Sequence, residues 1–280
     1  RSCDADVRGE PTVTFTPKEI EPLDVETKVE ADLEPLESPI YTKFNTYLGQ
    51  YNFLELIVRG DTPLPVTVTV FNLVGEQIHQ VVETVPANSQ RDLDINHYVR
   101  LACPAGEDNS SKPGCVDHRG DSFVDLDASG TIDTYGLVRL EFEVIEDVEL
   151  IGRLSHYRPD GDTGNFSFAF SRELRNSVTG ETYVIANTLD PQNSGFMVPN
   201  WAEIINLDAP QSYLYELFDE SGNLVLSQTI PPLASGRTEL NPREEFDIQG
   251  GHELAAKGNY LAKITPQGLS LIHISEPTRR

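Results

Sequence analysis

The chain has 280 residues, and its 45 Asp and Glu against 21 Lys and Arg give a formal net charge of −24. Nucleic acids and anionic membranes are bound through basic surfaces, so this charge excludes them as the main partners. Hydrophobic residues make up 38% of the chain, enough for a buried core, and the length suggests about two domains. No stretch approaches the roughly 18 consecutive apolar residues expected of a transmembrane helix.

Residues 1–38 are expected to form an extended acidic linker or stalk. They are rich in Glu, Asp, Pro, Thr and Val, and such a composition buries too little apolar surface to form a core. Cys3 lies in this segment. The sequence leaves open whether that cysteine carries a lipid anchor, is paired or is free.

From residue 39 onward the apolar residues recur with a period of two, which is the pattern of β-strands. Residues 65–71, 138–144 and 213–218 show it, and Gly, Pro, Asn and Asp bound these runs. No convincing amphipathic helix is found, and residues 253–257 could supply one helical turn at most. The sequence therefore predicts an all-β fold.

Two segments of the chain resemble each other, one beginning at Asn52 and the other at Asn200. Five aligned pairs are 147 residues apart: Phe71 and Phe218, Gly75 and Gly222, Ile78 and Val225, Ala87 and Ala234, Leu93 and Leu240. We interpret this as a tandem repeat of antiparallel β-sandwich units, spanning residues 39–172 and 173–268. The strand after residues 258–264 is expected beyond Gly268, so the second unit is expected to be truncated.

This rhythm of strands and turns resembles the immunoglobulin-like or fibronectin-like modules of bacterial secreted and surface proteins. The resemblance covers residues 39–268, without the Cys–Trp–Cys signature of true immunoglobulin domains, since Trp201 is the only Trp. It implies a non-catalytic structural or adhesive module, located outside the cell or at its surface, whose partners are unknown and could be a surface glycan or a protein.

The alternative is a carbohydrate-binding accessory region of a secreted enzyme. Such a region requires a flat or grooved face with exposed aromatic side chains. The candidates for that face are Tyr41, Tyr47, Tyr51, Phe53, Trp201, Tyr213 and Tyr215. We expect these side chains to pack in the core rather than to form such a face.

The first unit carries an insertion, residues 100–134, that the second lacks. Cys103 and Cys115 lie within it, separated by eleven residues, and this spacing predicts a disulfide formed in an oxidising compartment. The alternative is two free thiols. Inserted loops on a rigid scaffold are common places for function.

The insertion also contains the spacing of an EF-type calcium loop. Positions 1, 3, 5 and 9 hold Asp125, Asp127, Ser129 and Asp133. Gly130 and Ile132 fit positions 6 and 8, but position 12 is Gly136 and no helices are expected to flank the loop; Asp117 and Asp121 could supply further oxygens. We expect one structural calcium ion, and the alternative is an acidic turn without an ion.

Motifs for catalysis were not found. The sequence has no G-x-S-x-G, H-E-x-x-H or glycine-rich phosphate loop, and its histidines are scattered, so we predict that the chain is not an enzyme. His118 alone is expected to be solvated. The tripeptide Arg-Gly-Asp begins at Arg59 and again at Arg119, but three-letter motifs are frequent by chance.

The last twelve residues, 269–280, read LSLIHISEPTRR. They resemble the translation of a transposon adapter used to prepare sequencing libraries. We therefore expect adapter read-through here rather than natural protein, and a metagenomic, microbial source.

Overall fold

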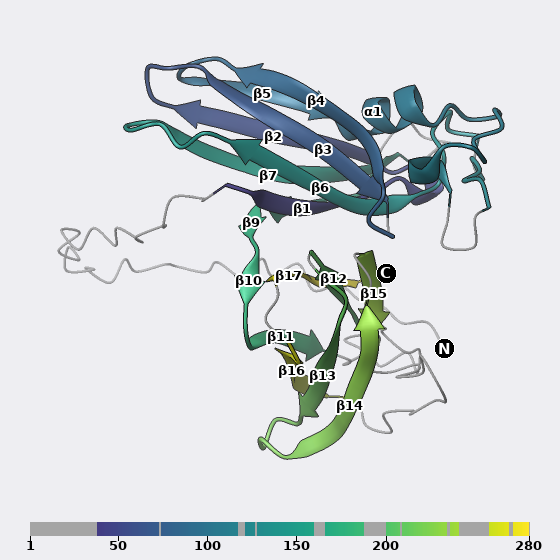
Figure 1. Ribbon diagram of the computed structural model, residues 1–280, viewed down its shortest axis with the longest axis vertical. Coiled ribbons are helices and arrows are strands. Elements are labelled where there is room, and N and C mark those ends of the chain that lie inside the picture. Colours follow the sequence, from purple (N-terminus) through teal and green to yellow (C-terminus); the bar gives the residue numbers. More distant parts are fainter. Residues whose placement is uncertain are drawn as a thin grey trace, which may run out of the picture. The chain divides into compact units, whose positions relative to one another are not determined.

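The computed structural model describes residues 38–72, 74–116, 121–126, 128–159, 166–187, 200–207, 209–233, 236–240, 258–268 and 271–279 (Figure 1). Strands dominate these residues, and α1 (Ile95–Ala102) is their one α-helix, which confirms the all-β expectation. Among the described residues, no helix is long and apolar enough to cross a membrane. The expected acidic linker, except Ser38, lies outside the described residues.

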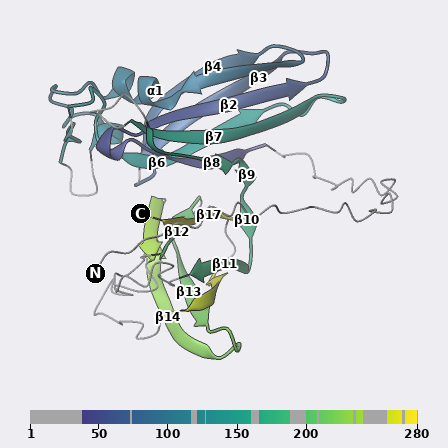
Figure 2. The same ribbon diagram turned by 180° about the vertical axis from the view of Figure 1, so that it is seen from behind.

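The first pair of sheets is entirely antiparallel (Figures 1 and 2). Its five-stranded sheet has the order β4 (Gln77–Val85), β3 (Leu64–Asn72), β6 (Tyr135–Phe142), β1 (Ile40–Asn45) and β9 (Arg175–Asn176). Its four-stranded sheet has the order β5 (Ser89–Asp94), β2 (Tyr51–Arg59), β7 (Glu149–Pro159) and β8 (Phe166–Glu173). Two short 3-10 helices, η1 (Tyr47–Gly49) and η2 (Pro113–Cys115), lie in the connections.

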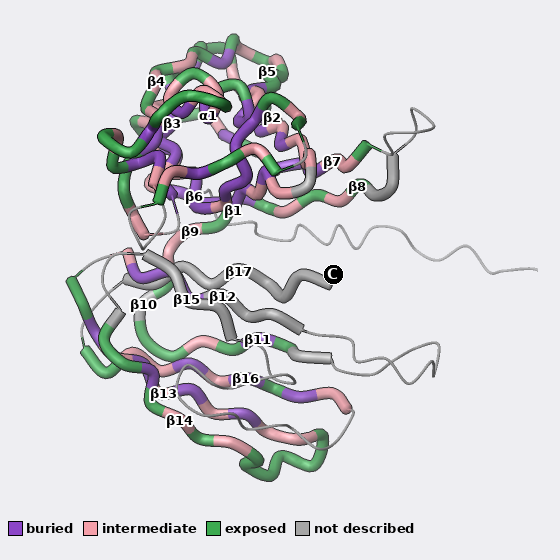
Figure 3. Tube along the Cα trace, turned by 90° about the vertical axis from the view of Figure 1, so that its right-hand side faces the viewer, coloured by how far each residue is buried: buried purple, intermediate pink, exposed green. Residues whose placement is uncertain are grey.

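The alternation of apolar residues explains how these two sheets pack. Leu54 and Leu56 of β2 are completely buried, as are Val66 and Val68 of β3, and all four belong to one core cluster. Figure 3 shows buried positions recurring along these strands. Because successive strand residues point to opposite faces, one face of each sheet closes the core and the other faces outward.

The second pair of sheets is also antiparallel. One sheet has the order β11 (Thr182–Asn187), β16 (Asn259–Pro266), β13 (Gln211–Phe218) and β14 (Leu224–Leu233). The other has the order β10 (Val178–Thr179), β17 (Leu271–Arg279), β12 (Asn200–Asn206) and β15 (Gly236–Leu240). Tyr213, Tyr215 and Leu217 of β13 are completely buried in its smaller core.

The order of strands recurs between the two pairs. The order β4-β3-β6-β1 matches β14-β13-β16-β11, and β5-β2-β7 matches β15-β12-β17. The register recurs as well: a bulge precedes Phe71, which then pairs with Gln77, and a bulge precedes Phe218, which then pairs with Leu224.

One local expectation was wrong. A helix, α1, follows β5 where none was predicted. Residues 166–173 form the strand β8, which pairs with β7. Residues 271–279, which belong to the segment that we expect to be adapter read-through, pair as β17 with β10 and β12. The β-branched Ile272 and Ile274 favour a strand whatever the origin of the segment.

Candidate functional site

The insertion, residues 100–134, starts in the last turn of α1, and the strand before α1 holds this helix in place. The carboxylate of Asp94 caps the helix by accepting a hydrogen bond from the backbone N of His97 at 3.1 Å. One face of α1 is buried against the core through Val99. The guanidinium of Arg100 donates to Asp94 and to Thr131 Oγ1, both at 3.0 Å, so it ties the start of the insertion to its end.

The side chain of Tyr98 links α1 to β4 through its hydroxyl and its ring. Its hydroxyl donates to a carboxylate oxygen of Glu83 at 3.0 Å, and its ring stacks on His79 with 5.3 Å between centroids. Burial, followed by the bond to Glu83, raises the pKa of Tyr98, while burial lowers the pKa of His79. Tyr98 therefore remains a protonated donor at any ordinary pH.

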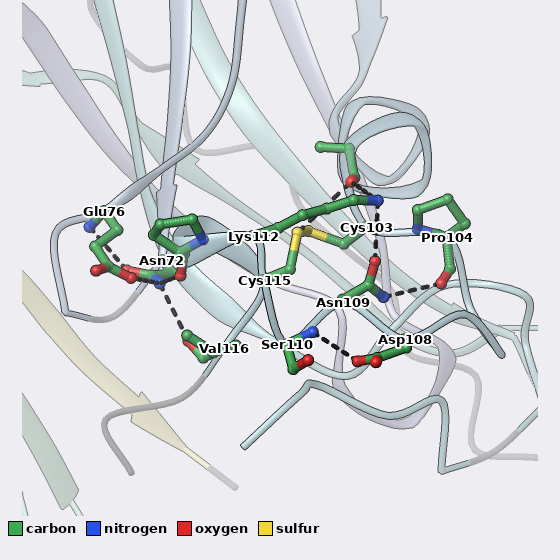
Figure 4. The surroundings of a disulfide bond; sticks show 12 residues. Asn72, Glu76, Cys103, Pro104, Asp108, Asn109, Ser110, Lys112, Cys115 and Val116 are labelled. Carbon is green, nitrogen blue, oxygen red and sulfur yellow. Dashed lines mark hydrogen bonds between the residues drawn. A yellow bond between two sulfur atoms is a disulfide. The ribbon is translucent and has the colours of Figure 1, made fainter. Parts of the chain in front are cut away.

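The predicted disulfide is present (Figure 4). Cys103 and Cys115 are both buried, with Cα atoms 5.6 Å apart. Lys112 runs alongside the bond, and its Nζ donates to Ala102 O and Asn109 Oδ1, each at 3.1 Å. The ammonium group thus satisfies a carbonyl at the end of α1, beside the disulfide.

The 3-10 helix η2, which contains Cys115, packs directly on β4 of the five-stranded sheet. A Cβ added at Gly114 would lie 2.3 Å from Gln77 O, so only glycine permits this approach. The side-chain amide of Asn72 donates to Val116 O at 3.3 Å and to Pro113 O at 3.4 Å. Both anchors come from the end of β3 and the start of β4, far away in sequence, and no local pattern indicates them.

In the expected calcium loop, later backbone groups form hydrogen bonds to the side chain of the first residue, Asp125. The carboxylate of Asp125 accepts hydrogen bonds from the backbone N atoms of Ser129 at 2.9 Å and Gly130 at 2.7 Å. Asp133, which is 2% exposed, accepts from the backbone N of Leu126 at 2.6 Å. This arrangement holds positions 1, 5 and 6 of the loop in one turn.

The described residues hold only part of the predicted ligand set. Asp127, Asp117 and His118 lie outside the described residues. Within the described part of the chain, no three His, Cys, Asp or Glu residues gather closely enough to hold a metal ion. The described residues thus include two carboxylates and one hydroxyl of the predicted set, those of Asp125, Asp133 and Ser129.

The end of the insertion is bound to the core sheet through Thr46. Its Oγ1 donates to Ile132 O at 2.7 Å or to Thr134 O at 2.9 Å, and it accepts from the backbone N of Thr134 at 2.9 Å. Thr46 is completely buried. The acidic loop is thus held between Arg100 on one side and Thr46 on the other.

Three of the candidate aromatic residues for a sugar-binding face are buried. Tyr213 and Tyr215 are 0% exposed and Tyr41 is 6% exposed, so these three cannot form a platform for sugars. Sequence alone could not tell the faces of β13 apart, because Leu214 and Phe218 on the opposite face are apolar too.

Three aromatic residues do lie together on an outer face. Tyr51 and Phe53 of β2 are half-buried there and pair with β7, where Tyr51 lies opposite Tyr157. Phe53 and Tyr157 meet edge to face with 5.9 Å between centroids. Tyr47 instead packs on Tyr135 with 5.4 Å between centroids. The side chain of Trp201 lies outside the described residues.

In the first Arg-Gly-Asp tripeptide, the arginine and the aspartate both bind other residues of the chain. Arg59 pairs with Glu149 at 3.1 Å, and Asp61 accepts a hydrogen bond from the amide of Asn88 at 2.9 Å. Arg119 of the second tripeptide lies outside the described residues.

His156 of β7 is a buried group that the sequence did not single out. It is 1% exposed, neither ring nitrogen has a hydrogen-bond partner, and its ring stacks on Phe170 with 4.5 Å between centroids. Burial, followed by the nearby charges of Arg172 and Lys43, lowers the pKa of His156 to about 3. The imidazole is therefore neutral in the folded protein.

Neither a protein-family model nor a curated protein matches this chain. In the insertion, the polar side chains of Arg100, Lys112 and Asp125 form hydrogen bonds with other residues of the same chain.

Proposed function

We propose that this chain is a non-catalytic structural or adhesive module of an extracellular or cell-surface protein. It would consist of two tandem immunoglobulin-like units that follow an acidic linker. The recurrence of strand order and register between the two pairs of sheets carries this proposal. Tandem units that contact mainly their neighbours are suited to spacing and to extended contact surfaces.

The disulfide supports an extracellular location. Disulfides persist in oxidising compartments and are rare in the cytosol of most cells. Cys103 and Cys115 are buried with Lys112 beside them, so the bond belongs to the folded insertion and is not a loose surface pair. A net charge of −24 keeps such a module soluble.

Two measurements test this proposal. An experimental structure should superpose β1–β7 on their counterparts β11–β17 with equivalent pairing, and non-equivalent strands would contradict the tandem units. An array of immobilised glycans should show no saturable binding of the oxidised chain. Specific binding there would favour the carbohydrate-binding alternative.

That alternative rests on the aromatic group of Tyr51, Phe53 and Tyr157. Aromatic rings offer an apolar body with a polar tip, which suits the mixed surface of a sugar. If a glycan binds here, Tyr157→Ala should weaken binding at least tenfold. The control is Tyr183→Ala, which removes an exposed tyrosine from the second pair of sheets.

We also propose that the insertion holds one structural calcium ion through Asp125, Asp127, Ser129 and Asp133. The turn around Asp125 supports the proposal, because its geometry matches the start of an EF-type loop. Calorimetry should show one calcium bound per chain, and Asp125→Asn should abolish it. Asp219→Asn is the matched control, because Asp219 accepts backbone bonds from Ser221 and Asn223 in a similar exposed turn. No heat of binding with the unaltered chain would contradict a calcium site.

A further inference from the structure

The outer face of the first five-stranded sheet is covered at β1 and β6, and the cover comes from the second pair of sheets. Tyr41 of β1 and Leu137 of β6 are each 6% exposed. They form a separate buried cluster with Ile205 of β12, against which Phe71 and Leu207 also pack. An apolar strand end of one sandwich thus rests on the sheet face of the other.

The corresponding face of the second pair of sheets is open. Tyr183 holds in β11 the place that Tyr41 holds in β1, since Tyr41 lies opposite Arg139 and Tyr183 opposite Lys263. Yet Tyr183 is 53% exposed.

The neighbours of Tyr183 extend this apolar surface. Ile185, 71% exposed, lies opposite Leu261, 40% exposed, and Leu261 lies opposite Phe218 on β13. We name Tyr183, Ile185 and Leu261 the acceptor face. A contiguous exposed apolar surface of this kind is a mark of an interaction site.

A counterpart of the covering strand end is exposed on the first pair of sheets. Ile57 holds in β2 the place of Ile205 in β12, because their partners Gln90 and Arg237 are 147 residues apart. Ile57 is 36% exposed and lies opposite Ile151, which is 37% exposed. We name Ile57 and Ile151 the donor face.

We propose that the donor and acceptor faces are the two unfilled halves of one head-to-tail interface, whose occupant is a second copy of this chain. The proposal rests on the proposed equivalence of the two sandwich units. The contact of Ile205 and Leu207 with Tyr41 and Leu137 would be its intramolecular example. An interface between two different faces does not close on itself and can extend a row of units.

The charges beside both faces are already paired, which permits contact between two acidic chains. Next to the donor face, Arg153 binds Glu55 at 2.6 Å and Arg59 binds Glu149 at 3.1 Å. Beside the acceptor face, Lys263 binds Glu181 at 2.8 Å. The net charge of −24 therefore acts mainly as a long-range repulsion, which salt screens.

The test is analytical ultracentrifugation of the full chain in about 0.5 M salt, where the Debye length is only about 4 Å. The chain should associate as its concentration rises toward about 1 mM, the order of the effective concentration between units joined by a short linker. Ile185→Asp disables the acceptor face and Ile57→Asp the donor face, and each change should weaken self-association at least tenfold.

Mixing these two variants provides the decisive result. Each retains one intact face, so an equimolar mixture should form dimers that cannot grow further. Val144→Asp, at a turn position 69% exposed and in neither face, should behave as the unaltered chain.

A chain that stays monomeric at 1 mM, or variants that do not complement each other, would overturn the interface. Either result would leave the two-unit architecture intact, because superposition tests that separately.

Discussion

The imidazole of His156 stacks on Phe170 inside the first pair of sheets and has no hydrogen-bond partner for either nitrogen. Protonation there would place an uncompensated charge in the core, near the positive side chains of Arg172 and Lys43. The folded state therefore keeps His156 in its neutral form, and the free energy of unfolding depends on pH.

We predict that stability falls as the pH drops below about 6.5. The unfolded imidazole binds a proton near pH 6.5, whereas the folded pKa of about 3 keeps His156 neutral. Between these values the unfolded state binds more protons, so acid favours unfolding, by about 2 kcal/mol at pH 5. In urea titrations at several pH values, His156→Leu should remove this part of the pH dependence. His97→Gln, at an exposed position, is the control and should retain it; parallel curves for all three proteins would contradict the prediction.

The disulfide controls the stability of the insertion. Its loop encloses eleven residues with few apolar side chains, so most of its order depends on the cross-link. Replacing both Cys103 and Cys115 by Ser should lower the free energy of unfolding by about 3 kcal/mol on the chain-entropy model. Urea denaturation measures this. Dithiothreitol should produce a similar loss in the unaltered chain and none in the double variant, and equal midpoints throughout would refute the prediction.

At the scale of elements, β6 approaches β3 more closely than a side chain allows at Gly136. A Cβ built there would lie 2.0 Å from Phe71 O, a backbone atom that cannot move aside. Gly136→Ala should therefore cost about 3 kcal/mol of stability by displacing the central strand. Gly258→Ala, where the nearest atom is 3.6 Å away, serves as the control in thermal unfolding. A Tm for Gly136→Ala equal to that of the control would contradict the close approach.

Elements with a strong local pattern were predictable from the sequence, and those held by distant contacts were not. Alternation over residues 65–71 and 213–218 located β3 and β13. The helix α1 has a local signal, the cap at Asp94 and one buried face with Ile95, Tyr98 and Val99. At eight residues, however, it depends on packing against β2 and β4, which the sequence does not place beside it. The cysteine spacing predicted the disulfide, but nothing near Asn72 in sequence indicates that it binds η2.

At the scale of the molecule, the described residues form two separate main cores. Leu56 belongs to the core of the first pair of sheets and Tyr215 to that of the second. Clusters without shared residues are expected to open independently.

We predict that a cavity in one core leaves the other unaffected. Leu56→Ala removes a completely buried side chain and should cost about 2–5 kcal/mol. Hydrogen exchange followed by mass spectrometry should then accelerate in β2, β3 and β7 and stay unchanged in β13 and β16. Faster exchange in both regions would mean that the chain unfolds as one cooperative body.

The pairing of β1 with β9 has a mechanical consequence. The chain enters the first pair of sheets at Ile40 and leaves it at Asn176, and these residues lie opposite each other in an antiparallel pair only two residues long. A pull on the flanking segments would load this pair from one end and open its hydrogen bonds one at a time, in unzipping geometry. Under tension the chain would thus lengthen first at the β1–β9 pair, before the load reached the six residue pairs between β1 and β6.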